Sequence, residues 1–133
     1  MADEKVALEV ALSEFERMCS ARRVDIDESK MSEEDRESFV DLRDKLVAAI
    51  CEGSLVVADD GTPTYTPRSG EPITFHPATG ATFMAADDIK EGKNVRKTVA
   101  MMTEMTRSKQ GAFATLEAHD FKVCLSLGQL FLA

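Results

Sequence analysis

Residues 55–66 read LVVADDGTPTYT, and this stretch decides the fold class. It opens with a short apolar, β-branched run from Leu55 to Ala58, which favours a strand. Asp59-Asp60-Gly61 supplies turn residues, including one that tolerates positive φ. The threonine-rich run from Thr62 to Thr66 favours a returning strand. Because Pro63 has no backbone N–H for a sheet ladder, we expect that strand at a sheet edge.

A third strand is predicted downstream of a turn at Arg68-Ser69-Gly70. Residues 71–76 alternate, with Ile73 and Phe75 on one face, and Pro77 ends the run. The centre of the chain therefore predicts an antiparallel meander of two or three strands. A sheet of this size is too small to be stable alone and has to pack on helices.

Upstream of the meander, residues 1–50 predict two amphipathic helices joined by a polar linker, Val24 to Met31. The first runs from Asp3 to about Ala21. Its apolar residues recur at spacings of three and four: Leu8, Leu12, Phe15, Met18 and Cys19. The second starts at Ser32, with Asp35 as a weak capping box, and ends at Gly53. Its apolar stripe is Phe39, Leu42, Leu46 and Ile50, with Val47 beside it. We expect the two helices to pair antiparallel.

Downstream of the meander the pattern is helical again. A short helix is expected over Thr82 to Ile89, ending near Gly92. A second, capped by Asn94, carries Val95, Val99, Met101, Met102 and Met105. After a break at Arg107 to Gly111, Thr115 caps a final helix. Its tail, Phe121 to Leu132, is apolar on more than one face, so it is either buried centrally or offered to another chain.

These elements predict an α+β fold in a single domain, residues 1–133. It divides into an acidic helical pair (1–52), the β-meander (53–77) and a C-terminal helical part (78–133) packed on the meander. The length of 133 residues and the 44% apolar content suffice for one buried core.

The charge balance narrows the function classes. Asp and Glu number 24 against 16 Lys and Arg, a net charge of -8. Such a chain is poorly suited to sequence-independent nucleic-acid binding or to an anionic membrane surface. It contains no apolar run of about 18 residues for a spanning helix, and Met1 to Lys5 does not start a signal peptide. We therefore expect a cytoplasmic protein that binds neither nucleic acid nor membrane.

Metal and cofactor chemistry is not indicated. Cys19, Cys51 and Cys124 are dispersed without a CxxC pair, so we expect buried reduced thiols, and two histidines are too few for a zinc site. Asp25 to Ser29 looks like a calcium loop, but Lys30 and Arg36 occupy the positions that need Gly and an acid. We expect no metal, no cofactor and no catalytic residue. An enzyme using Cys124, His119 or His76 is the open alternative.

Two features suggest partner binding. Lys90, Lys93, Arg96 and Lys97 form a basic cluster, interpreted as a solvated helix face or as a dock for the acidic half of a second copy. Four methionines, at 84, 101, 102 and 105, are interpreted as core filling or as an adaptable partner surface.

The order of signals from Ile73 to Phe131 resembles the phage tail assembly chaperones. The matching pieces are Ile73 to Pro77, Ala86-Asp87-Asp88, Val99 to Met102, Leu116 to Phe121 and Leu130-Phe131-Leu132. The resemblance covers about 60 residues, and the acidic helical pair lies outside it.

The resemblance implies a non-catalytic cytoplasmic protein that keeps the long, helical tape measure protein soluble during tail assembly and that self-associates. Such a chaperone is expected to be absent from the mature particle. Its apolar, partner-binding side chains are then expected to be Met101, Met102, Met105, Phe113, Leu127, Leu130 and Phe131. A generic adaptor and a structural tail or head-joining protein are the alternatives.

Overall fold

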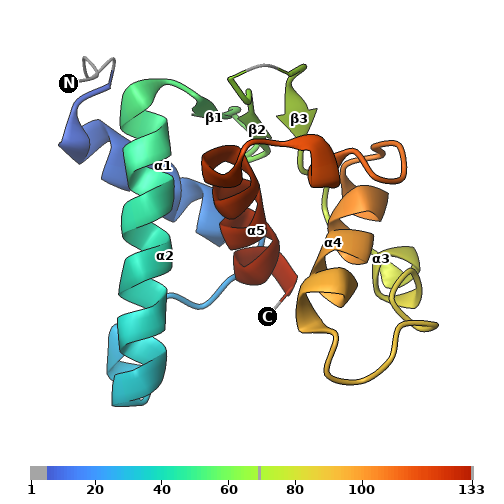
Figure 1. Ribbon diagram of the computed structural model, residues 1–133. Helices are drawn as coiled ribbons and strands as arrows, with labels where there is room; N and C mark the ends of the chain where they lie inside the picture. The colour runs from blue at the N-terminus through green and yellow to red at the C-terminus, as the bar shows by residue number, and fades with distance from the viewer. Residues whose placement is uncertain (1–5, 69, 133) are drawn as a thin grey trace.

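The computed structural model describes residues 6–68 and 70–132. Helices lie at both ends of the chain and a three-stranded antiparallel sheet lies between them in sequence, which confirms the α+β class (Figure 1). The elements are α1 (Leu8–Ala21), η1 (Glu28–Lys30), α2 (Glu33–Glu52), β1 (Leu55–Val57), β2 (Pro63–Tyr65), β3 (Ile73–Thr74), α3 (Gly80–Met84), α4 (Asn94–Met105), η2 (Phe113–Thr115) and α5 (Ala118–Leu132).

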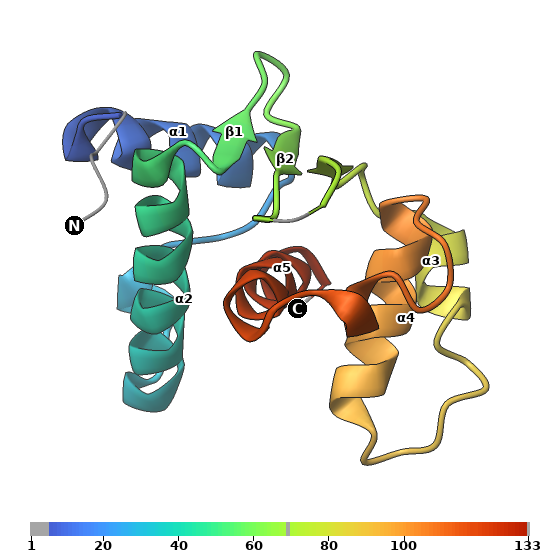
Figure 2. The ribbon, with the colours of Figure 1, turned by 45° about the horizontal axis from the view of Figure 1, so that its top comes forward.

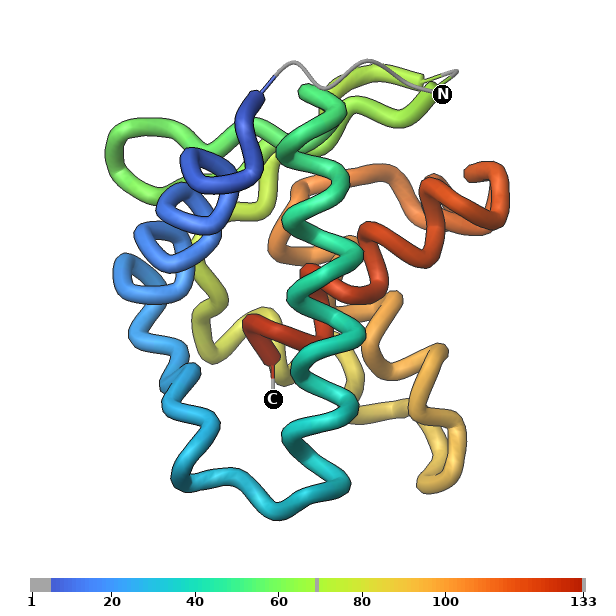
Figure 3. The backbone as a smooth tube through the Cα atoms, turned by 90° about the vertical axis from the view of Figure 1, so that its left-hand side faces the viewer, coloured from blue at the N-terminus to red at the C-terminus, as the bar shows by residue number. Residues whose placement is uncertain are grey.

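Helix α2 has the ends that the sequence predicts. The Ser32 side chain accepts the Asp35 backbone N–H at 3.1 Å before the first turn. Gly53 ends the helix with φ +84°, a conformation that glycine adopts without steric cost. In Figure 3 α1 descends and α2 ascends, but Figure 2 shows α1 crossing α2 steeply, so the two helices touch without lying side by side in the antiparallel pair that the sequence predicts.

Helix α1 corrects part of the predicted core. It begins at Leu8, and the predicted first turn at Asp3 lies outside the described residues. Phe15 is buried as expected, but Leu8 is 55% exposed and Leu12 37% exposed. The first turns of α1 lie on the outer side of α2, away from the sheet and α5, so no other described helix or strand covers that flank (Figure 2). Ala11 is buried in their place.

The sheet has the order β1-β2-β3, so β2 is the central strand. The prediction that Pro63 would keep it at an edge is wrong. Pro63 is the first residue of β2, a position where a missing N–H is tolerated. Its carbonyl still accepts the Phe75 N–H at 3.0 Å. Tyr65 pairs with Leu55 on one side and Ile73 on the other.

The C-terminal helices differ from the predictions mainly at their ends. Helix α3 stops at Met84, earlier than predicted, and the chain continues from there through turns up to Ile89. Asn94 is the first residue of α4 rather than its cap. Thr115 ends η2, and α5 begins only at Ala118, so Thr115 does not cap α5.

Helix α5 occupies the centre of the molecule, between α2 and α4 (Figures 1 and 2). This confirms central burial of the apolar tail. Val123, Cys124 and Leu127 are at most 1% exposed. At Gly128, α5 approaches α4 so closely that a Cβ atom added to the glycine would lie 2.6 Å from the Met102 sulfur.

Candidate functional site

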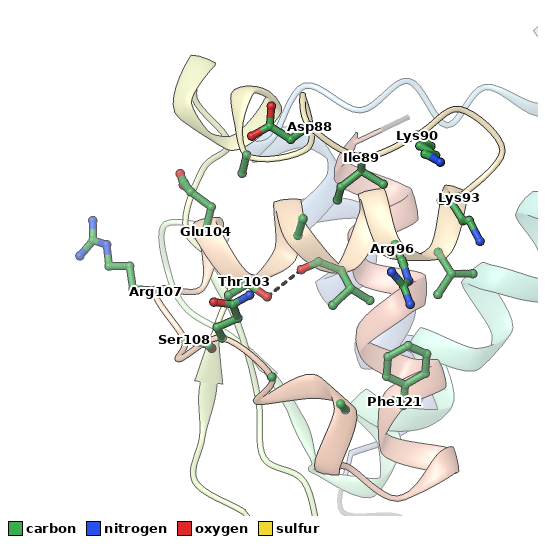
Figure 4. A pocket seen from close by; sticks show the side chains of 17 residues that line it. Asp88, Ile89, Lys90, Lys93, Arg96, Thr103, Glu104, Arg107, Ser108 and Phe121 are labelled. Carbon is green, nitrogen blue, oxygen red and sulfur yellow. Dashed lines mark hydrogen bonds between the residues drawn. The ribbon is translucent and has the colours of Figure 1, made fainter.

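A groove with a volume of about 1030 Å³ lies between α4 and the segments on either side of it in sequence. Residues 85–93, which lead into α4, form one wall, and residues 107–114, which leave it, form the other. Phe121 of α5 lies at the base (Figure 4). Helix α4 turns Met102 and Met105 into the core, so the adjoining side of the helix is left to line the groove.

The groove is apolar in its middle. Val95 is 55% exposed there, while Ile89, Val99 and Phe121 are partly exposed. In Figure 4, Ile89 and Phe121 lie at opposite borders of the groove, with Arg96 between them. The hydroxyl of Thr103 donates to the Val99 carbonyl at 2.7 Å, which satisfies the donor without a ligand. A ligand with an apolar face would therefore displace water from aliphatic and aromatic surface.

One end of the groove is basic. Lys90, Lys93 and Arg96 gather there in Figure 4, away from Asp88 and Glu104 at the opposite end. With Arg107, the lining holds four cationic and two acidic side chains, although the chain as a whole carries a net charge of -8. An acidic ligand is attracted to this end more strongly than to the rest of the surface.

The basic cluster predicted from the sequence is therefore divided. Lys97 does not line the groove and pairs with Glu91 at 2.6 Å, which lowers the pKa of that carboxyl group through the hydrogen bond and the charge of the lysine. At the far end Glu104 accepts a 3.0 Å hydrogen bond from Thr82. The three remaining cations of the cluster are left facing the groove.

The predicted partner-binding side chains lie elsewhere. Five of the seven are buried in the core, which corrects the expectation that they form a surface: Met102, Met105, Phe113, Leu127 and Leu130. They are buried because α5 needs apolar neighbours on both its sides. Met101 and Phe131 are partly exposed, and neither lines the groove. The Arg22 guanidinium lies 5.1 Å from the Phe131 ring centroid and donates to the Phe75 carbonyl.

Sequence reasoning missed the groove itself. The sequence places Val95 and Val99 in the apolar set of a predicted helix, and Phe121 in the apolar tail. The available signal was the arrangement of Val95 and Val99 four residues apart, with Lys93 and Arg96 beside them. That pattern places apolar and cationic side chains on one side of a helix.

The three residues of the alternative enzyme hypothesis differ in exposure: Cys124 is buried, His76 is partly exposed and His119 is exposed. Burial, with a contribution from Asp120, raises the pKa of the Cys124 thiol to about 12, which disfavours a thiolate nucleophile. His119 is exposed, whereas the neighbouring Asp120 turns inward and accepts the Tyr65 hydroxyl. Cys19 and Cys51 are also buried. Residues 6–68 and 70–132 contain no group of three candidate metal ligands.

A second groove, of about 600 Å³, lies between α2 and the end of α5. Phe39, Leu42 and Leu130 supply apolar surface there, beside Asp35 and Asp41. Its charge is thus opposite to that of the groove beside α4.

Searches with family models, among curated proteins and among solved structures found no match to this chain. Among the helices that the structure describes, none has the length and hydropathy needed to cross a membrane.

Proposed function

We propose that this protein is a non-catalytic phage tail assembly chaperone whose groove beside α4 binds helical segments of the tape measure protein. The observation that supports the proposal most directly is the groove, which combines an apolar middle with a basic end on an acidic molecule. The resemblance of residues 73–131 to the chaperone family supplies the class of client.

The shape of the groove favours a helix as its ligand. It runs beside α4, a helix of 12 residues, or about 18 Å at 1.5 Å per residue. An amphipathic helix can lay one apolar side against Val95, Val99 and Phe121. Acidic residues beside that apolar stripe would then face Lys93 and Arg96.

The acidic face of α2 suits a chaperone that carries apolar cargo. Glu34, Glu37, Asp41 and Asp44 follow one another at spacings of three and four, and all four are exposed. Such a stripe gives each complex a negative surface, and repulsion between like charges opposes the aggregation of loaded complexes.

The proposal is tested by purifying the tagged chain from cells that carry its intact gene neighbourhood and counting copies by quantitative mass spectrometry. Recovery of one very long helical protein with many copies of this chain supports a chaperone. A one-to-one complex overturns the proposal in favour of an adaptor. Retention of the chain in finished tails or capsids overturns it in favour of a structural role.

The groove is tested in the same purification with a pair of charge reversals, Lys93→Glu and Arg96→Glu. We expect the recovered client to fall about tenfold, because opposite charges at the basic end become like charges. Lys45→Glu with Lys122→Glu changes the net charge equally at exposed sites outside the groove and should leave recovery unchanged. Equal losses in both pairs would show that net charge, and not the groove, holds the client.

A further inference from the structure

The outer flank of α1 forms an exposed surface that has both apolar and acidic side chains. Leu8 and Leu12 lie four residues apart on one side of the helix and are 55% and 37% exposed. Glu9 and Glu16 are exposed beside them, and Glu16 lies one turn beyond Leu12. We call these four residues the leucine strip. Two exposed leucines on one helix side lose stabilisation that burial would give.

The cation nearest to the leucine strip in sequence is already engaged. Arg17 forms an ion pair with Glu14, and its guanidinium also donates to the carbonyls of Val57 and Ala58 at the end of β1. These contacts fix Arg17 toward the sheet. The strip is left with two carboxylates beside its leucines.

The groove beside α4 is complementary to the leucine strip in apolar surface and in charge. Val95, at 55% exposed, and the partly exposed Val99 offer apolar surface, and Lys93 and Arg96 offer positive charge. The strip extends from Leu8 to Glu16, or about 12 Å at 1.5 Å per residue, and the facing residues from Lys93 to Val99 extend over about 9 Å.

The strip cannot occupy the groove of its own chain. Figures 1 and 2 place α1 and α4 on opposite sides of α5, at the two ends of the molecule. A contact between the strip and the groove therefore joins two copies. Because it pairs two different surfaces, it leaves a free groove at one end of the pair and a free strip at the other.

We propose that, in the absence of client, the leucine strip of a second copy occupies the groove. Leu8 and Leu12 of one copy cover Val95, Val99 and Phe121 of the other, and Glu9 and Glu16 face Lys93 and Arg96. This inference rests on the proposed function of the groove as a helix-binding site. It adds regulation of that site: self-association masks the groove, and the client competes for it.

Sedimentation velocity on the purified chain alone tests the contact by charge exchange. The wild-type chain should form head-to-tail oligomers that dissociate as salt screens the charges. The groove variant Lys93→Glu, Arg96→Glu should be monomeric alone, as should the strip variant Glu9→Lys, Glu16→Lys. Mixing the two variants restores opposite charges at every contact and should restore the oligomers.

Glu52→Lys with Glu71→Lys is the matched control, since it makes the same change in charge at exposed residues outside the strip, the groove and the acidic face of α2. The proposal is overturned if the wild-type chain is monomeric at its highest soluble concentration, if the mixture stays monomeric, or if the control dissociates the oligomers equally. Circular dichroism of each variant alone establishes that loss of assembly is not unfolding.

Client recovery separates this inference from the proposed function. The strip variant should lose self-association and retain the client, whereas the groove variant should lose both. If the wild-type chain is monomeric and the groove variant still loses the client, masking is wrong and the function stands. If charge exchange restores oligomers but no client is recovered with any variant, the contact stands and the proposed function fails.

Discussion

The hydroxyl of Tyr65, on the central strand, donates a 2.5 Å hydrogen bond to the carboxylate of Asp120 in the first turn of α5. Both side chains are buried, and the second carboxylate oxygen accepts the Arg68 backbone N–H at 3.3 Å. The pair thus ties the sheet to the helix at the centre of the molecule.

Tyr65→Phe should lower the free energy of unfolding by about 1–3 kcal/mol, because one oxygen of a buried carboxylate then loses its donor and only the Arg68 N–H remains. Equilibrium urea denaturation measures the loss. Asp120→Asn keeps an acceptor for the tyrosine and should cost less than Tyr65→Phe. If both variants are as stable as the wild-type chain, the hydrogen bond does not contribute to stability.

The fold should also lose stability at alkaline pH. Burial, and secondarily Glu16 or Asp120, raises the pKa of the Cys19 and Cys124 thiols to about 12, and burial with the Asp120 hydrogen bond raises the pKa of Tyr65. A raised pKa means that the folded state favours the neutral form. The contribution of the thiols is complete below about pH 9 and is lost as the pH rises toward 12.

Urea denaturation in steps from about pH 8 to 11 tests this dependence. The free energy of unfolding should decline across that range, and Tyr65→Phe should decline less steeply above about pH 10, the ordinary pKa of tyrosine. A flat profile would contradict the burial of these groups.

Gly128→Ala should destabilise the protein by about 1–3 kcal/mol, since the added Cβ would lie 2.6 Å from the sulfur and 2.8 Å from the Cγ of Met102. Met102→Ala alone should also destabilise it, because it leaves a cavity. The double variant should lose less stability than the two single losses added together, since each change relieves the other. Strict additivity would show that the two residues do not touch.

The exposure of Leu8 and Leu12 gives a test of how α1 is oriented. Replacing both leucines with Ser should cost only about 1–2 kcal/mol at concentrations where the chain is monomeric, because both side chains are partly exposed. Phe15→Ala, on the buried side of the same helix, should cost about 3–5 kcal/mol. Comparable losses in the two variants would mean that the leucines are covered within the monomer.

The elements that could be predicted from the sequence are those whose signals are local. Ser32 and Gly53 determine the two ends of α2 through a side-chain cap and a positive φ, and both act within one turn of the chain. The run at 55–66 predicted its hairpin because Gly61 sits between two β-type segments, and it adopts φ +87°.

The remainder depends on which surfaces meet in three dimensions. A periodic pattern assigns Leu8 and Phe15 to the same apolar side, but only the position of α2 decides which of them is covered. The same limit applies to Pro63, whose place in the sheet depends on β3, a strand that begins after it. Asp120 lies in the first turn of α5, 55 residues after Tyr65, and only the tertiary fold brings the two side chains together.

The central position of α5 also has a consequence for synthesis. The ribosome makes α1, α2 and the sheet before the helix on which α2 packs, so these segments emerge with their apolar faces uncovered. The core cannot close until Val123, Cys124 and Leu127 have left the exit tunnel. The packing of α2 is therefore completed only after α5 has been made, and a ribosome stalled before α5 would hold a chain with these apolar faces exposed.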